Sequence, residues 1–160
     1  MKRLLILAIF FFSVFCVSAQ EFSFESFVSM GDYIGKQIRD IPDGYVREGI
    51  GSNSYSRNLT REVYDGFTTS DGIIIGYMWG INSNRRSFIY SEFDKIVPVI
   101  KEQFGEPLPF QDVMLFWILG DKLLLAAAED DTLIVFFGLP GGIGITQDRL
   151  DELVESMSNN

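Results

Sequence analysis

Three apolar runs near the carboxyl end constrain the fold of this chain more than any other feature. They span residues 113–119, 123–128 and 133–137, and only residues 120–122 and 129–132 separate them. Short apolar runs with turn residues between them are typical of antiparallel strands joined by tight turns. The run 123–128 also contains good helix formers, but so short a segment between two turns makes only a marginal helix. The sequence therefore predicts a three-strand antiparallel meander.

The other elements follow from the spacing of apolar residues. Intervals of three and four residues are typical of amphipathic helices, and β-branched runs between turn residues are typical of strands. Grouped strands separated by helices indicate an α+β domain, in which an antiparallel β-sheet, a hairpin plus the meander, packs with three amphipathic helices. The predicted helices span residues 23–41, 92–104 and 147–157, and the predicted hairpin joins 67–69 to 73–79.

A helix followed by strands occurs twice in this order, near residues 24–81 and again over 92–137. The two halves share no residue-by-residue repeat. The order of elements therefore suggests a duplicated helix-then-strands unit at the level of architecture alone.

Two glycines interrupt the first predicted helix. Gly31 lies on its apolar stripe and Gly35 lies beside that stripe. Each glycine costs about 1 kcal/mol relative to alanine in a helix interior. We therefore expect Gly31 to be a position of close packing, against another backbone, where a side chain would not fit.

The first 19 residues have the features of a secretory signal peptide. Lys2 and Arg3 form a short positive start, residues 4–15 are apolar, and the small Ala19 ends the segment. These features occur in the order that signal peptides require. The apolar run is shorter than the roughly 20 residues that a membrane-spanning helix needs. We expect cleavage after Ala19.

Cleavage there leaves a single domain over residues 20–157 and a loose tail over 158–160. The domain is then exported, periplasmic or secreted, with no integral membrane segment. A lipid anchor on Cys16 is the alternative, and the bulky Phe15 before it disfavours that modification.

The expected mature chain contains neither cysteine nor histidine. The single cysteine, Cys16, leaves with the signal peptide, and the sequence holds no histidine. This composition excludes disulfides, Cys/His zinc sites and catalysis through cysteine or histidine. The formal net charge of −9 becomes −11 once Lys2 and Arg3 are removed. So acidic a chain disfavours nucleic acids and anionic membranes as partners.

Two segments have a superficial likeness to ligand-binding loops. Residues 138–144 lie between a predicted strand and a predicted helix, but Asp148 and Asp151 place negative charge where a phosphate would bind. Residues 129–131 are acidic, but they lack the alternating ligands and the central glycine of a calcium loop. The sequence therefore predicts neither a cofactor nor a metal site.

One basic loop is the best candidate for polar recognition. Arg85 and Arg86 are adjacent in an otherwise acidic chain, and they follow Tyr77 and Trp79 of the predicted hairpin. Paired guanidinium groups can hold a carboxylate or a sulfate through two parallel hydrogen bonds. The alternative is a solvated loop whose charges offset nearby acids.

The meander is apolar on both faces, which is unusual for a sheet with one solvated side. We expect a second apolar face to line a pocket for an apolar ligand, or to be buried against a protein partner or in a homodimer. A plain core covered on both sides is the alternative. The residues assigned to that second face by their parity are Phe116, Ile118, Leu124, Ile134 and Phe136.

These observations favour a non-catalytic exported binding or interaction module. The missing thiol and imidazole groups and the strongly apolar sheet carry this interpretation. Two alternatives remain open: a hydrolase that uses a pair of carboxylates, and an envelope-assembly component that pairs through a sheet edge. A pocket with two close carboxylates would favour the first, and a long uncovered strand would favour the second.

Overall fold

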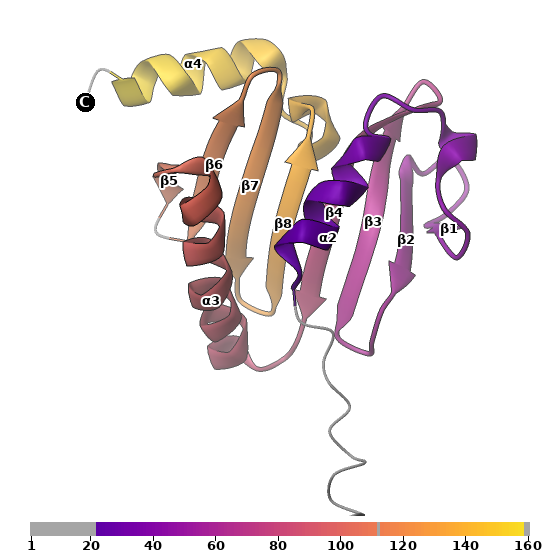
Figure 1. Cartoon of the computed structure of the whole chain (residues 1–160), viewed down its shortest axis with the longest axis horizontal. Helices are drawn as coiled ribbons and strands as arrows, with labels where there is room; N and C mark the ends of the chain where they lie inside the picture. Colours follow the sequence, from indigo (N-terminus) through magenta and orange to yellow (C-terminus); the bar gives the residue numbers. More distant parts are fainter. Residues whose placement is uncertain (1–21, 112, 159–160) are drawn as a thin grey trace, which may run out of the picture.

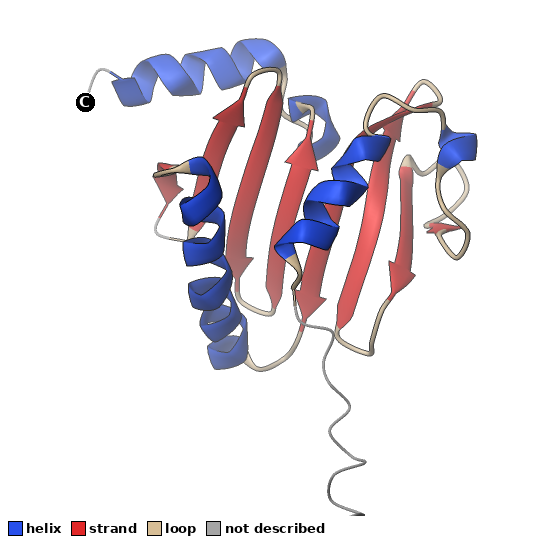
Figure 2. Ribbon diagram, viewed as in Figure 1, coloured by secondary structure: helices blue, strands red, loops and turns tan. Residues whose placement is uncertain are grey.

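An eight-stranded antiparallel sheet is the framework of the fold (Figure 2). The computed structural model describes residues 22–111 and 113–158. The strand order is β1-β2-β3-β4-β8-β7-β6-β5, so β4 and β8 meet at the centre and the short strands β1 and β5 form the edges. The strands are β1 (Val46–Arg47), β2 (Ser54–Asn58), β3 (Val63–Ser70), β4 (Ile73–Asn82), β5 (Leu108–Gln111), β6 (Met114–Leu119), β7 (Lys122–Glu129) and β8 (Thr132–Gly138).

Helices lie on both faces of this sheet (Figure 1). On what we term the first face, α2 (Phe24–Met30) lies in front of the central strands and α3 (Arg86–Phe104) lies toward β6 and β7. On the second face, α4 (Gln147–Ser158) lies near one end of the strands. The described residues also include three 3-10 turns, which are η1 (Gly31–Tyr33), η2 (Ile38–Asp40) and η3 (Pro140–Ile143). None of the helices in the described part of the chain is long and apolar enough to span a bilayer.

Two apolar clusters, one on each face, hold these layers together. The first face contributes the larger cluster, in which Phe27 of α2 and Ile100 of α3 pack against strand residues such as Val135. On the second face Phe136 and Leu125 pack with Leu150 of α4. Burial of this apolar surface is the main driving force for the fold.

The α+β class and the antiparallel sheet are confirmed, and so is the meander of β6, β7 and β8. The predicted hairpin is also present, but its strands β3 and β4 are longer than expected. The edge strand β5 was missed because Pro109 lies inside it and argues against a strand. The closing helix begins at Gln147 as predicted and ends at Ser158.

The prediction of one continuous helix over residues 23–41 is wrong. Ser23 caps α2 as expected, since its Oγ accepts a hydrogen bond from the Ser26 amide, but α2 ends at Met30. Beyond it, Gly35 adopts φ +91° and its amide donates to the Ile74 carbonyl over 2.8 Å. The chain therefore leaves the helix because β4 satisfies its backbone groups instead.

The start predicted for the second long helix is also wrong. α3 begins at Arg86, six residues before the predicted residue 92, and continues through Pro98 to Phe104. Arg86 therefore belongs to a helical turn and not to a loop, and Arg85 is the N-cap residue without a side-chain capping bond.

Leu124 lies on the opposite face from the one that its parity suggested. Leu119 pairs with Lys122, so the turn contains two residues and not three. A turn of two residues inverts the parity of the facing side chains, so β7 is reversed relative to β6, and the two-residue turn before Thr132 restores the original parity on β8. Leu124 consequently lies on the first face with Trp117 and Phe137, whereas Leu123 and Leu125 lie on the second face.

The predicted signal peptide, residues 1–19, and the alternative lipid site at Cys16 lie outside the described residues. The same holds for the last part of the predicted tail, residues 159–160.

Candidate functional site

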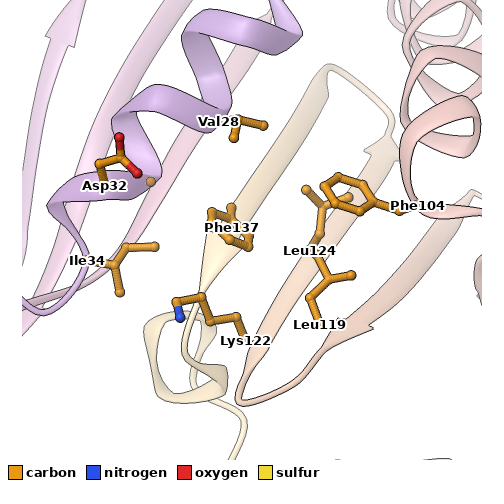
Figure 3. Close-up of a pocket in the computed structure, with 9 residues that line it drawn as sticks. Val28, Asp32, Ile34, Phe104, Leu119, Lys122, Leu124 and Phe137 are labelled. Atoms are coloured by element: carbon orange, nitrogen blue, oxygen red, sulfur yellow. The ribbon is translucent and has the colours of Figure 1, made fainter.

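A pocket of about 580 Å³ opens on the first face, between α2 with η1 on one side and the end of α3 on the other (Figure 3). Its floor consists of Leu124 of β7 and Phe137 of β8, and Phe104 of α3 forms the opposite wall. The complete lining is Val28, Gly31, Asp32, Ile34, Phe104, Leu119, Lys122, Leu124 and Phe137.

The early end of α2 creates this pocket. A helix continuing to residue 41 would run on past Tyr33, but the helical backbone ends after η1, and Gly35 and Lys36 pair with Ile74 at the start of β4 instead. Phe137 is therefore only half-buried, and Val28 on the pocket wall is 37% exposed. Apolar side chains that remain partly exposed around a concavity are typical of a ligand-binding site.

Two charged side chains, Lys122 and Asp32, lie among these apolar residues. Lys122 is the first residue of β7, and its Nζ lies 3.3 Å from the Asp121 carboxylate. Its side chain is 34% exposed, whereas Asp32 is exposed to solvent. In Figure 3 the carbon stem of Lys122 lies below the Phe137 ring and its nitrogen points toward the Ile34 side. Such a lysine contributes both apolar contact area and a positive charge.

A buried carboxylate, Asp65, is the centre of a second polar site under α2. It is 2% exposed and forms a two-bond ion pair with Arg57, at 2.8 Å to Nε and 3.0 Å to Nη2. The hydroxyls of Tyr45 and Tyr77 also donate to Asp65 Oδ2, over 2.8 and 2.7 Å. Four donors therefore compensate one buried charge.

The tyrosines of this network cannot act as bases near neutral pH. Burial raises the pKa of Tyr77 far above its usual range, and the hydrogen bond to Asp65 raises it further. The same two causes, in the same order, raise the pKa of Tyr45. Both hydroxyls consequently remain protonated donors, which suits a structural network that stabilises the sheet beneath α2.

Of the predicted site residues, Tyr77 belongs to this network and Trp79 lies near it, and both side chains contribute to the core. Tyr77 is 4% exposed and Trp79 is 6% exposed. Their rings contact Phe27 and Phe22 respectively, at centroid distances of 5.4 and 5.0 Å. With serines of α2 they line a smaller pocket of about 290 Å³, separate from the one in Figure 3.

The two arginines of the predicted basic loop already have partners. Arg85 pairs with Glu62 at 3.1 Å, and Arg86 approaches Asp130 at 3.6 Å. Both guanidinium groups also lie over aromatic rings of α3, those of Phe88 and Tyr90. The structure therefore places Arg85 and Arg86 at the beginning of α3, away from Tyr77, Trp79 and both pockets.

The residues predicted on the second apolar face have different environments. Phe116 and Phe136 are buried in the cluster that contains Leu150 of α4, and Ile134 packs against that cluster. Ile118 is 36% exposed. Of the predicted site residues only Leu124 lines the large pocket, which is on the first face and not on the second.

Sequence reasoning missed most of the pocket lining. Phe104 and Phe137 are the last residues of the predicted helix 92–104 and of the apolar run 133–137, and no local pattern shows that they face one cavity. The one available signal was Gly31, a glycine on an apolar stripe.

Across the residues that the structure describes, no group of three or more aspartate or glutamate side chains is arranged to hold a metal ion. The chemistry available at the large pocket is therefore apolar contact plus two charges of opposite sign.

Comparisons of the chain with protein-family models, with curated proteins and with solved structures found no match.

Proposed function

We propose that this protein is a non-catalytic binding module that holds an apolar small molecule between α2 and α3. The observation that carries the proposal is the pocket of about 580 Å³, whose floor and walls are mainly apolar. Small-molecule sites typically have volumes of roughly 300–1,000 Å³, apolar linings and a few polar groups.

The expected affinity follows from the apolar area that a ligand can bury. Each buried methylene contributes about 0.8 kcal/mol. A chain with about ten buried methylenes then gains about 8 kcal/mol, from which the costs of association must be subtracted. Since about 8 kcal/mol alone corresponds to a dissociation constant of about 1 μM, we expect simple apolar probes to bind more weakly than this.

The structure lends no support to the hydrolase alternative. The buried acid Asp65 is fully engaged by Arg57, Tyr45 and Tyr77, so its oxygens are not directed at a substrate. Pairing through a sheet edge is also not favoured, because β1 has two residues and β5 has four. Short edge strands are poor templates for strand addition.

A matched pair of tryptophan variants tests the proposed function. Val28 and Val99 are both helical valines, 37% and 41% exposed, but only Val28 lines the pocket. Val28→Trp fills the pocket and should weaken dodecanol binding, measured by calorimetry, by about tenfold or more. Val99→Trp should leave it unchanged. Wild-type protein without measurable dodecanol binding, or a Val28→Trp variant that binds normally, contradicts the proposal.

A protein-interaction role is a second candidate, and one exposed residue favours it. Ile50 lies at the tip between β1 and β2, fully exposed, with Gly49 at φ +154° and Gly51 at φ +81° beside it. The Ile50 side chain is therefore fully available to an apolar pocket on a partner. A photo-crosslinking residue at position 50 should then give one defined protein adduct in cells, whereas the same residue at position 73 should not. Equal labelling at both positions contradicts this role.

We further propose that the chain is exported and arose from a duplicated unit. The signal-peptide pattern of residues 1–19 supports export.

Two features of the topology support duplication. A helix precedes four strands in each half, since α2 precedes β1–β4 and α3 precedes β5–β8. The last strands of the two halves, β4 and β8, also pair at the centre of the sheet. In this scheme α4 is an addition to the second half.

A further inference from the structure

We infer that the ligand of the large pocket is an amphipathic anion, with its apolar chain over Phe137 and Leu124 and its carboxylate at Lys122. This inference rests on the proposed function, since it names the ligand class of the same pocket. The apolar floor and the cationic side chain belong to one cavity, which supplies both parts of the recognition (Figure 3).

Lys122 is placed by the sheet and not by a mobile loop. It follows the two-residue turn at Gly120 and Asp121, and its backbone pairs with Leu119 of β6. The pairing holds the lysine backbone beside the pocket, where Leu119 and Lys122 both line the cavity. A site built on strands positions a charged group better than a loop does.

The positive charge at Lys122 outweighs the negative charge at Asp32 as a determinant of the ligand. Two-thirds of the Lys122 side chain is removed from solvent, whereas Asp32 is exposed. Water screens an exposed charge strongly and a partly buried one less. A ligand carboxylate therefore gains more at Lys122 than a ligand ammonium gains at Asp32.

The present partner of Lys122 is easily replaced. Asp121 lies 3.3 Å from Nζ and is 77% exposed, so this neighbouring pair is weak. A ligand carboxylate that enters the pocket can take over the same ammonium, and Asp121 then returns to water. Removing the competitor with Asp121→Asn should strengthen anion binding by about two- to threefold.

Three probes with the same twelve-carbon chain test the inference. Dodecanoate, dodecanol and dodecylammonium carry an anionic, a neutral and a cationic head group. Calorimetry at pH 8, below the solubility limit of dodecanol and the micelle concentrations of the two ionic probes, compares them. We expect dodecanoate to bind about five- to tenfold more tightly than dodecanol, and dodecylammonium more weakly than dodecanol. The preference of dodecanoate over dodecanol should disappear in Lys122→Met.

Lys95→Met is the matched control. Lys95 also pairs with a neighbouring acid, Glu92, but it lies on α3 and is not among the pocket residues. This variant should keep the full preference for dodecanoate. Circular dichroism of both variants verifies that the fold is retained.

The outcomes separate this inference from the proposed function. If dodecanol binds but dodecanoate has no advantage, or if Lys122→Met keeps the advantage, the anion inference is wrong and the apolar pocket stands. If dodecanol does not bind, both are wrong. A loss of preference in Lys95→Met as well would assign the effect to the overall charge of the protein and overturn the role of Lys122.

Discussion

The ring of Phe137 occupies the space that a side chain on Gly31 would need. A Cβ built on Gly31 would come within 2.7 Å of two carbons of that ring. The expectation of close packing at Gly31 is therefore confirmed, although the partner is a side chain of β8 and not another backbone. This contact joins the end of α2 to the floor of the pocket.

Gly31→Ala should destabilise the protein by about 1–3 kcal/mol, because the added methyl group overpacks the contact. Urea unfolding measures the change. Gly141→Ala is the control, since a Cβ there meets nothing within 4 Å, and it should be neutral or slightly stabilising. In a Phe137→Leu background the cost of Gly31→Ala should largely vanish. An undiminished cost in that background would show that the strain lies elsewhere.

Arg57→Leu should destabilise the protein by about 2–4 kcal/mol, because it leaves the buried Asp65 charge without its cationic partner. The control is Arg149→Leu, which breaks an exposed pair with Glu152 and should cost less than about 1 kcal/mol. Chemical denaturation of the two variants gives both values. Equal costs would mean that burial of Asp65 does not matter.

The raised tyrosine pKa values predict loss of stability in alkali. The unfolded chain releases the hydroxyl protons of Tyr45 and Tyr77 near pH 10, whereas burial and Asp65 keep them bound in the folded protein. This stabilisation is complete below about pH 10 and is lost as the pH rises above it. The free energy of unfolding should fall by about 1.4 kcal/mol per pH unit for each tyrosine. Urea unfolding between roughly pH 9 and 11 should show a shallower slope for Tyr77→Phe, and parallel slopes would refute the assignment.

Export makes a prediction about the amino terminus. The intact mass of protein recovered after export should correspond to a chain that begins at Gln20, because Ala19 supplies the small residue that signal peptidase needs. A lipid-modified Cys16 at the amino terminus would contradict this and place the protein on a membrane surface.

The sequence predicted the elements whose signals are local. The meander was predictable because apolar runs alternate with turn residues, and the last helix because Leu150 lies on an apolar stripe that follows the cap residue Thr146. The face of Leu124 was not predictable, since it depends on whether the preceding turn has two residues or three.

The site itself depends on contacts between residues far apart in the chain. Nothing near Gly31 indicates that Phe137 will lie against it, and nothing near Asp65 indicates that Tyr45 and Arg57 will surround it. The sequence indicated more apolar residues in the meander than one covered face needs. The pairing of the strands determines that the partly exposed ones, such as Phe137, line a pocket on the first face.

Direct location of a bound ligand tests the central claim of an apolar site between α2 and α3. Intermolecular NOEs between the methylene protons of dodecanol and the protein report which side chains lie against the chain. We predict NOEs to the ring protons of Phe137 and Phe104 and to the methyl groups of Val28. NOEs to Ile118 and Ile134 on the second face, with none to Phe137, would contradict the account.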